Sequence, residues 1–362
     1  MIRPDMDRPT IAVYEARASE WRDRRPARFT DRAERFAASV ATGGMRADLG
    51  CGAGLHLPLL GRPVVGIDAA HAMLELARDV APDAGLVQAD LEALPLRRGS
   101  LDGGWARASY LHIARPWLPA ALAELHQALR VDAPAVLTMR LAPVDGLLAD
   151  DDFPGRFFAG WQPEPFRDVL VGAGFTVDEL TVESERPEWL HARVTRARTL
   201  PDFVGPELRV LMVGLNPSEY AADAGVGFAR PGNRFWPAAL AAGLVSRDRD
   251  PRHALRHHHV GMTDLVKRAT PGAATLRRDE YRDGLARLGR LVAWLQPRVV
   301  CVVGLTGWRT ARDPKAAPGV QADRFEGVPA YVMPNTSGVN AHASLDDFAA
   351  HFRVVQRLAD ER

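Results

Sequence analysis

Hydrophobic and polar positions follow two different rhythms along the chain, and together they predict a series of strands and helices. Short apolar runs are typical of buried strands, and apolar residues that recur every three or four positions are typical of helices. In the first half, the runs predict strands at residues 45–49, 64–67, 86–88, 101–106 and 135–140, and the helical periodicity covers residues 14–24, 31–40, 70–80 and 118–130. This alternation favours a parallel sheet with helices between successive strands.

A second series of the same kind follows in the other half of the chain. Strands are predicted at residues 209–215, 299–304 and 330–333, and helices at residues 234–242, 278–295 and 344–358. The intervening segment TRARTLPDFVGPE is polar, contains proline and glycine, and lacks sustained periodicity. We therefore expect an α/β protein with two domains, residues 1–198 and 208–362, and a linker at residues 199–207. Two strand-like runs within residues 173–197 would close the first sheet as a hairpin.

Charge separates these halves, although the chain as a whole is almost neutral. Residues 1–200 contain 24 basic and 28 acidic side chains, and the remaining residues contain 22 and 17. The net charges are therefore −4 and +5. The positive half is the one whose charge suits a nucleic-acid partner.

The cysteines and the apolar segments limit where the protein could work. Cys51 and Cys301 are too few for a disulfide framework or a four-thiolate metal site. The N-terminal sequence MIRPDMDRPT lacks the apolar core of a secretion signal, and no stretch reaches the roughly 18 apolar residues that a membrane span needs. We expect a cytoplasmic protein that has no membrane partner.

The first candidate site is a glycine-rich turn that follows the first predicted strand. Residues 45–60 read MRADLGCGAGLHLPLL, so Gly50, Gly52 and Gly54 lie between a strand and an expected helix. Glycines at such a place let a ligand approach backbone amides. The next strand ends in Asp68, whose carboxylate could accept hydrogen bonds from both hydroxyls of a ribose. Asp90 follows the third strand, where it could accept a hydrogen bond from the amino group of an adenine.

This ordered set, DLGCGAG, GID, AD and SLDGGWARASYLHI, resembles the small-molecule type of class I S-adenosylmethionine-dependent methyltransferases over residues 10–198. The resemblance implies a Rossmann-like sheet and S-adenosyl-L-methionine as the cofactor. It assigns the methionine and ribose moieties to the turn from Asp48 to Gly54, the ribose hydroxyls to Asp68, and the adenine to Asp90 and Leu91.

The acceptor of the methyl group is not identified by this pattern. The strand where nucleobase amino-methyltransferases have an [N/D]-P-P-[Y/F] motif reads WARASYLHI, and no Pro-Cys nucleophile follows. Methylation of DNA adenine or cytosine is therefore disfavoured. Tyr110 and His112 either line an acceptor pocket or pack in the core.

The second candidate site consists of three loops in the C-terminal half. The strand-like run VLMVGL delivers Asn216 and Pro217 at its carboxyl end, where α/β sheets bind ligands. GFARPGNRFW follows, and VMPNTSGVNAHAS comes after a later strand. These segments resemble GINPG, FAxPxNRFW and LPNPSGLS of the mismatch-specific uracil/thymine DNA glycosylases, in the uracil-DNA glycosylase superfamily, over residues 208–360. The resemblance implies a three-layer α/β/α fold.

It also implies a role for each of four residues in the removal of a base from DNA. Asn216 would hold the attacking water, and Asn335 would contact the base or its flanking phosphate. Phe228 would stack on the flipped base, and Asn233 lies in the supporting loop. Hydrolysis of the N-glycosidic bond develops positive charge on the sugar and negative charge on the leaving base, so an orienting amide suits the water. No cofactor is implied for this reaction.

A wedge must fill the gap that a flipped base leaves in the stack. The resemblance assigns this wedge to Val339, which follows Gly338 in the last loop. Val339 is smaller than the usual leucine, Ser218 replaces a glycine, and Thr336 replaces a proline. Asparagines in place of the aspartate and histidine of the fast relatives favour a slow, mismatch-type enzyme.

The histidines at positions 253, 257, 258 and 259 are the one group that invites a metal site. Adjacent histidines point in different directions, and no carboxylate or cysteine completes a ligand spacing. We expect no metal site.

These features together predict a bifunctional protein. Its expected activities are base excision of uracil, or of a related mispaired or damaged pyrimidine, from double-stranded DNA with U:G or similar mismatches, and methyl transfer to an unknown acceptor. Two alternatives remain. The C-terminal domain could be a non-catalytic DNA-binding module of a methyltransferase, or the N-terminal domain could be a cofactor sensor of an active glycosylase.

Overall fold

The computed structural model describes residues 8–25, 29–184, 186–338 and 343–361. The chain divides into two compact units, Met1–Ala197 and Arg198–Arg362. Each unit contains its own sheet, as the two series of strands and helices predict.

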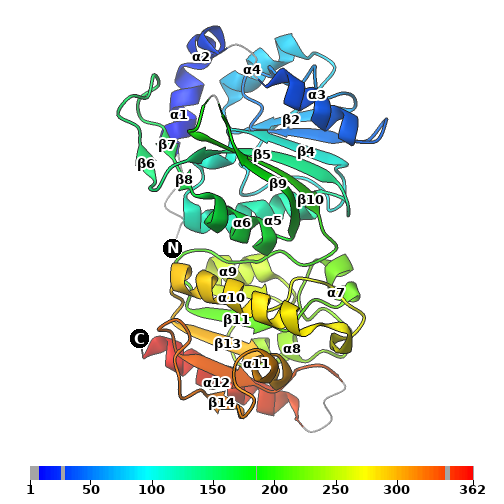
Figure 1. Ribbon diagram of the computed structural model, residues 1–362, viewed down its shortest axis with the longest axis vertical. Coiled ribbons are helices and arrows are strands. Elements are labelled where there is room, and N and C mark those ends of the chain that lie inside the picture. The colour runs from blue at the N-terminus through cyan, green and yellow to red at the C-terminus, as the bar shows by residue number, and fades with distance from the viewer. Residues whose placement is uncertain (1–7, 26–28, 185, 339–342, 362) are drawn as a thin grey trace. The chain divides into compact units, whose positions relative to one another are not determined.

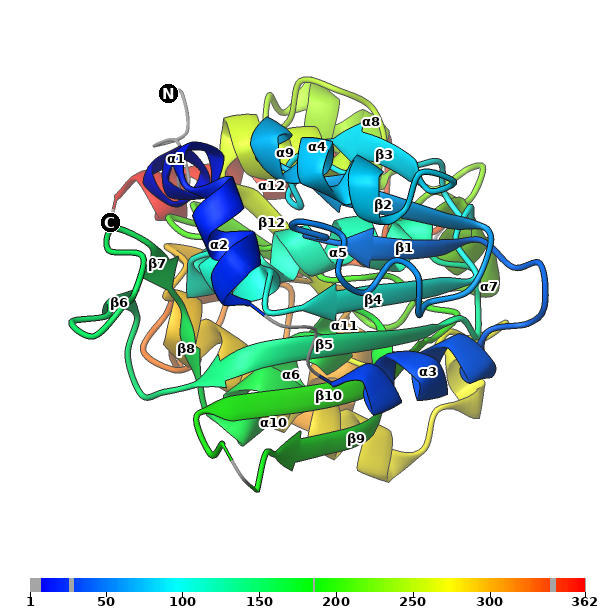
Figure 2. The same ribbon diagram turned by 90° about the horizontal axis from the view of Figure 1, so that it is seen from above.

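The first unit is built on an eight-stranded sheet, whose main order β3-β2-β1-β4-β5-β10-β9 can be followed in Figure 2. Its strands are β1 (Arg46–Leu49), β2 (Val64–Asp68), β3 (Gly85–Gln88), β4 (Gly103–Arg107), β5 (Pro134–Leu141), β8 (Gly160–Trp161), β9 (Phe175–Val182) and β10 (Trp189–Arg196). Strands β1 to β5 are parallel, whereas β9 and β10 form the predicted antiparallel hairpin. The short strands β6 (Gly146–Leu147) and β7 (Phe157–Phe158) pair separately.

Helices accompany these strands largely where the periodicity predicts them. They are α1 (Arg8–Ala16), α2 (Ala18–Arg24), α3 (Thr30–Ser39), α4 (His71–Val80), α5 (Leu118–Ala128) and α6 (Pro163–Gly172), with short 3₁₀ turns at Tyr110–His112 and Arg115–Trp117. Helix α5 is almost wholly buried, and its sequence, LPAALAELHQA, is mostly apolar. The fold class predicted for this half, a Rossmann-like doubly wound sheet, is confirmed.

The strand order reverses between the neighbouring strands β1 and β4. The chain continues from β1 to β2 on one side of this point and from β4 to β5 on the other, and such sheets bind ligands at this point. The loops after these two strands touch. A Cβ atom on Gly50 would lie 2.2 Å from Cβ of Ser109, and Gly50 has a φ of +76°, so this position requires glycine.

The helix expected after the glycine turn is absent from the structure. Residues 52–60 instead form consecutive turns, in which the N–H of Leu57 donates to the carbonyl of Gly54 and that of Leu59 to the carbonyl of His56. Pro58 explains the difference, because proline lacks an N–H and disfavours helical geometry in the residue before it. The turn therefore presents amides without a helix N-terminus.

The second unit contains a five-stranded sheet of order β12-β11-β13-β15-β14. The strands are β11 (Val210–Gly214), β12 (Val260–Asp264), β13 (Val299–Val303), β14 (Gly319–Val320) and β15 (Ala330–Met333), and all but β14 are parallel. The helices are α7 (Glu219–Ala224), α8 (Phe235–Ala241), α9 (Pro251–His258), α10 (Arg278–Leu295), α11 (Leu305–Ala311) and α12 (Leu345–Asp360), with a 3₁₀ turn at Ala273–Thr275. Helices α10 and α12 lie on opposite faces of the sheet (Figure 1). The predicted α/β fold of this half is confirmed.

The segment at residues 199–207 is not a free linker, contrary to the sequence expectation. Asp202 is buried in the second unit, where it accepts hydrogen bonds from Lys267 (2.7 Å), Arg287 (2.8 Å) and Thr263 (2.6 Å). Phe203 exchanges backbone hydrogen bonds with Met262 of β12. The polar composition of this segment reflects a buried ion-pair network, which local sequence statistics do not distinguish from a solvated loop.

No helix in the described part of the chain is long and apolar enough to cross a membrane.

Candidate functional sites

A cavity of about 440 Å³ opens at the carboxyl ends of the central strands of the first unit. Of the residues predicted to bind the cofactor, Asp48, Gly50, Gly52, Asp68, Asp90 and Leu91 all line it. Gly54 does not. A Cβ atom at Gly54 would lie 2.9 Å from Ala77, so this glycine permits the turn to pack against α4.

Asp48 is a strongly perturbed carboxyl group in this cavity. It is buried, and its Oδ2 has no hydrogen-bond partner among the described residues. Burial, together with the nearby charge of Asp68, raises the pKa of Asp48 to about 8, although Arg107 opposes the shift. A buried carboxyl group with one oxygen that lacks a partner among the described residues fits a cationic donor on a ligand, such as the ammonium group of a methionine moiety.

Asp68 lies at the end of β2 and holds the glycine turn in place. Its oxygens accept hydrogen bonds from the backbone N–H of Gly52 (2.8 Å) and of Ala70 (2.9 Å). Burial raises the pKa of Asp68, although these bonds favour the charged form. Asp90 is exposed and accepts a bond from the N–H of Glu92 (2.9 Å), which fixes the loop after β3.

Of the two aromatic candidates after β4, only His112 reaches the cavity. Its Nδ1 lies 2.6 Å from the carbonyl of Phe157, so Nδ1 carries the proton and Nε2 accepts from the hydroxyl of Tyr14 (2.9 Å). Arg156 donates to the same hydroxyl. Burial lowers the pKa of His112 to about 4, which keeps its ring neutral at physiological pH. Tyr110 is a fully buried core residue.

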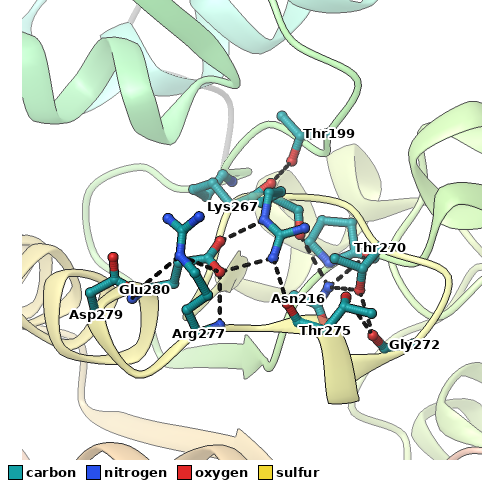
Figure 3. A network of polar contacts seen from close by, with 11 residues as sticks. Thr199, Asn216, Lys267, Thr270, Gly272, Thr275, Arg277, Asp279 and Glu280 are labelled. Carbon is teal, nitrogen blue, oxygen red and sulfur yellow. Dashed lines mark hydrogen bonds and ion pairs between the residues drawn. The ribbon is translucent and has the colours of Figure 1, made fainter.

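In the second unit, Asn216 follows β11 and its side-chain amide is fixed by three acceptors (Figure 3). Its Nδ2 donates to the carbonyls of Pro217 and Arg268, both at 3.1 Å, and to the hydroxyl of Thr270 at 2.8 Å. Backbone carbonyls only accept, so the nitrogen must face them. The amide oxygen of Asn216 has no partner among the described residues.

Phe228 lies beside the same strand. Its backbone is left-handed, with a φ of 58°, and its ring stacks on Phe235 with centroids 4.1 Å apart. A Cβ atom on Gly214, the last residue of β11, would lie 3.5 Å from the tip of the Phe228 ring. Asn233 supports this loop, because its Oδ1 accepts from the N–H of Phe235 (2.9 Å) at the start of α8.

Asn335 follows β15 at the same edge of the sheet. It is exposed, and its Oδ1 accepts from the N–H of Ser337 (2.9 Å). Because β13 separates β11 from β15, Asn335 and Asn216 follow strands that are about 10 Å apart. Gly338 lies against Gly232, whose oxygen would be 3.0 Å from an added Cβ. The predicted wedge, Val339, lies outside the described residues.

Two of the unusual residues in these loops have structural roles. The hydroxyl of Ser218 accepts from the N–H of Ala221 (3.1 Å) and caps α7, which a glycine could not do. Thr336 is fully buried, and its carbonyl accepts from the N–H of Arg234 (2.9 Å). The guanidinium of Arg234 donates to the carbonyls of Ala343 and Ser337, so this arginine holds the last loop.

Two family models match the chain in the regions of these sites. A methyltransferase domain model matches residues 47–137, and the model of the uracil DNA glycosylase superfamily matches residues 201–359. The chain joins a methyltransferase domain to a uracil DNA glycosylase superfamily domain. The second match begins inside the segment predicted to be a linker, in keeping with the burial of Asp202.

Solved structures similar to this chain include three methyltransferases. A S-adenosylmethionine dependent methyltransferase from Mesorhizobium loti is 19% identical, covers 45% of this chain and 98% of its own, and has a TM-score of 0.38. A 1,6-didemethyltoxoflavin-N1-methyltransferase from Burkholderia thailandensis is 18% identical, with coverages of 52% and 88% and a TM-score of 0.41. A TehB-like S-adenosylmethionine-dependent methyltransferase from Corynebacterium glutamicum is 22% identical, with coverages of 52% and 98% and a TM-score of 0.39.

Asp264 is a residue of the glycosylase superfamily domain that the sequence analysis missed. It ends β12 and pairs in register with Gly214, where an added Cβ would lie 2.3 Å from the Asp264 Oδ1. The carboxyl group and the Phe228 ring therefore lie against the same backbone. Burial raises the pKa of Asp264 to about 6. The strand went unpredicted because Gly261 and Thr263 interrupt its short apolar run.

Two of the four clustered histidines of the same domain share one hydroxyl group. Oγ of Ser246 lies 2.8 Å from Nε2 of His253 and 2.7 Å from Nε2 of His258. Within the described ranges, no group of three or more His, Cys, Asp or Glu side chains is arranged to hold a metal ion.

Proposed function

We propose that the glycosylase superfamily domain hydrolyses the N-glycosidic bond of uracil, or of a related mispaired or damaged pyrimidine, in double-stranded DNA. The observation that carries this proposal is the fixed amide of Asn216. Three acceptors hold its nitrogen, so its oxygen, which has no partner in the described part of the chain, has one orientation. That oxygen would accept a hydrogen bond from a water molecule, whose lone pair is then directed at the sugar carbon.

The surrounding residues suit the other demands of this reaction. Phe228 provides an aromatic surface for a flipped base, as enzymes that act on extruded bases require. Asp264, beside it, would accept a hydrogen bond from a donor on that base. Asn335 would contact the base or its phosphate from the far side of the same sheet edge. Such a reaction would place the protein in base-excision repair of U:G and similar mismatches.

A strand-cleavage assay tests the proposal directly. Incubation with a labelled U:G duplex followed by alkali should cleave the uracil strand, and the reaction should persist in EDTA because no metal takes part. The Asn216→Ala variant should bind the duplex but release base about a hundredfold more slowly, since its water is no longer oriented. Gln356→Ala also removes a single side-chain amide, from α12, and should keep the wild-type rate.

Each alternative result has a distinct meaning. Binding of the duplex without base release would support a non-catalytic DNA-binding module. An unchanged rate in Asn216→Ala would exclude Asn216 from the mechanism. If the protein neither binds the duplex nor releases the base, a function on DNA is refuted.

We further propose that the methyltransferase domain binds S-adenosyl-L-methionine in its cavity, where the cofactor would supply an electrophilic methyl group. Asp48 would face the cationic methionine moiety, Asp68 the ribose, and Asp90 and Leu91 the adenine. The support for this assignment is the buried carboxyl group of Asp48, whose Oδ2 lacks a partner among the described residues, and the glycine turn that Asp68 holds in place.

Calorimetry with S-adenosylhomocysteine tests the cofactor assignment. The Asp68→Ala variant should bind this product much more weakly than the wild type, because it loses a ligand contact and the brace of the turn. Asp83→Ala, which changes an exposed carboxylate of the same domain, should bind normally. Equal affinities would contradict the ribose assignment, and a glycosylase rate that responds to S-adenosylhomocysteine would support the sensor alternative.

A further inference from the structure

We propose that the methyl acceptor is a small molecule with an apolar body and one anionic group, and that Arg140 binds that group. This inference rests on the proposed methyl transfer, because it names the substrate class of the same cavity. Its starting point is the distribution of charge along the cavity wall. The ends of β1 and β2 contribute Asp48 and Asp68, whereas the ends of β4 and β5 contribute Arg107 and Arg140.

The sheet register places the two arginines on one face. Arg107 of β4 pairs with Thr138 of β5, and Arg140 lies two residues further along β5. Side chains two residues apart on a strand share a face. Trp189 of β10 pairs with Arg140, so its indole ring lies on that face as well. All three side chains line the cavity.

The other arginines of the cavity are already compensated by carboxylates or by an aromatic ring. Arg25 pairs with Asp152 at 2.6 Å, Arg186 with Glu188 at 2.9 Å, and Arg156 with Asp151. The guanidinium of Arg107 lies 4.9 Å from the centre of the Phe29 ring, and its charge acts on Asp48. None of these groups has its charge directed to the cavity alone.

Arg140 differs from all of them. It is half-buried, and within the described part of the chain its guanidinium makes no ion pair and no hydrogen bond. Asp150 also lines the cavity, but it is exposed and does not pair with Arg140. A cation that loses water without gaining a partner is costly. The planar fork of a guanidinium matches the two oxygens of a carboxylate or phosphate, so an anionic ligand would supply the missing partner.

The remaining walls describe the rest of the acceptor. Besides polar groups, the cavity is lined by rings and aliphatic side chains, which include Tyr14, Trp21, Leu148, Phe158 and Trp189. Such walls favour an apolar or aromatic body. A volume of about 440 Å³, shared with a cofactor, leaves room for a small molecule rather than a macromolecule.

The test compares acids with neutral molecules of the same shape. The full chain is loaded with S-adenosylhomocysteine and titrated with 4-hydroxybenzoate against 4-hydroxybenzamide, and with phenyl phosphate against phenol, so that carboxylate and phosphate are read separately. At least one acid should bind about tenfold or more tightly than its neutral counterpart. Arg140→Gln should remove this preference, and Arg140→Lys should retain part of it, since lysine keeps the charge but not the fork.

Two controls make the result decisive. Arg186→Gln changes an arginine of the same cavity that is already paired, so it should leave the preference intact. Affinity for S-adenosylhomocysteine should stay within about twofold in every variant, which shows that the fold survives. The same titrations without S-adenosylhomocysteine detect the anion site even if this cofactor product fails to bind. Failure of the cofactor assignment is therefore distinguishable from failure of the anion site.

Three outcomes would overturn the proposal. Equal or absent binding of the acids and their neutral counterparts would show that no anion site exists. An unchanged preference in Arg140→Gln would place the site elsewhere. Weaker binding of a single-stranded oligonucleotide to Arg140→Gln, with no change for the acids, would identify a nucleic acid as the ligand of Arg140 instead.

Discussion

The Asp264→Asn substitution should stabilise the glycosylase superfamily domain above pH 6, although it replaces a residue of the candidate site. Asp264 has a pKa of about 6 in the folded chain, because burial disfavours its charged form. The ordinary value is about 3.9. Between these two pH values the carboxyl group is protonated in the folded chain but ionised in the unfolded chain. Stability therefore falls as the pH rises from about 4 to about 6. Above pH 6 the full cost of the buried charge is present.

The size of the effect follows from the shift. The pKa of Asp264 differs by about two between the folded and the unfolded chain. This difference corresponds to about 3 kcal/mol, because a change of one in a pKa is worth about 1.36 kcal/mol. This figure is an upper bound, because Asp264 retains some solvent exposure. An amide has the same shape and no charge, so Asp264→Asn should recover most of it at pH 8 and little at pH 4.5. For a unit of this size, 3 kcal/mol raises the melting temperature by about 6 to 12 °C.

Scanning calorimetry of the full chain at pH 4.5, 6 and 8 measures this difference. The Asp323→Asn variant changes an exposed carboxylate of the same unit and should leave the melting temperature unchanged at each pH. Lower stability of Asp264→Asn than of the wild type at pH 8 would contradict a costly buried charge at this position. The same difference between the two proteins at pH 4.5 and pH 8 would contradict it as well.

Two further predictions concern one residue in each site that holds the local geometry in place. Thr270→Val should slow base release about three- to tenfold in single-turnover measurements, because the Asn216 amide loses one of three acceptors while the water site stays intact. Gly50→Ala should abolish S-adenosylhomocysteine binding in calorimetry, because its Cβ would lie 2.2 Å from that of Ser109 at a φ of +76°.

Matched variants define what would contradict these two predictions. Thr275→Val removes another hydroxyl of the same loop, which donates to Gly272 and not to the amide, and should keep the wild-type rate. Gly85→Ala places a Cβ 3.7 Å from its nearest neighbour, an ordinary contact, and should bind normally. Rates that fall equally in both threonine variants, or normal binding by Gly50→Ala, would show that the geometry has been misread.

Local sequence patterns are enough to predict the fold class of both halves and the position of each candidate loop. Buried parallel strands such as VLMVG are apolar throughout, and loops at strand ends carry glycine or asparagine for local backbone reasons, so short segments reveal them. The same local signals failed where the environment is set from afar. Pro58 prevented the helix expected after Gly54, and Asp202 looked solvated because its partners, Lys267 and Arg287, lie 65 and 85 residues away.

The environment of these groups depends on the tertiary structure. It brought Asp264 against Gly214 by sheet register and fixed the Asn216 amide with Thr270. It also left Arg140 without a charged partner among the described residues while pairing the neighbouring arginines. Charge and hydrogen-bonding capacity are properties of a residue, but burial and partners arise from chain segments that fold together. A pKa of about 6, an oriented amide oxygen and an unpaired guanidinium therefore cannot be read from the sequence, since each depends on what lies a few ångströms away in space.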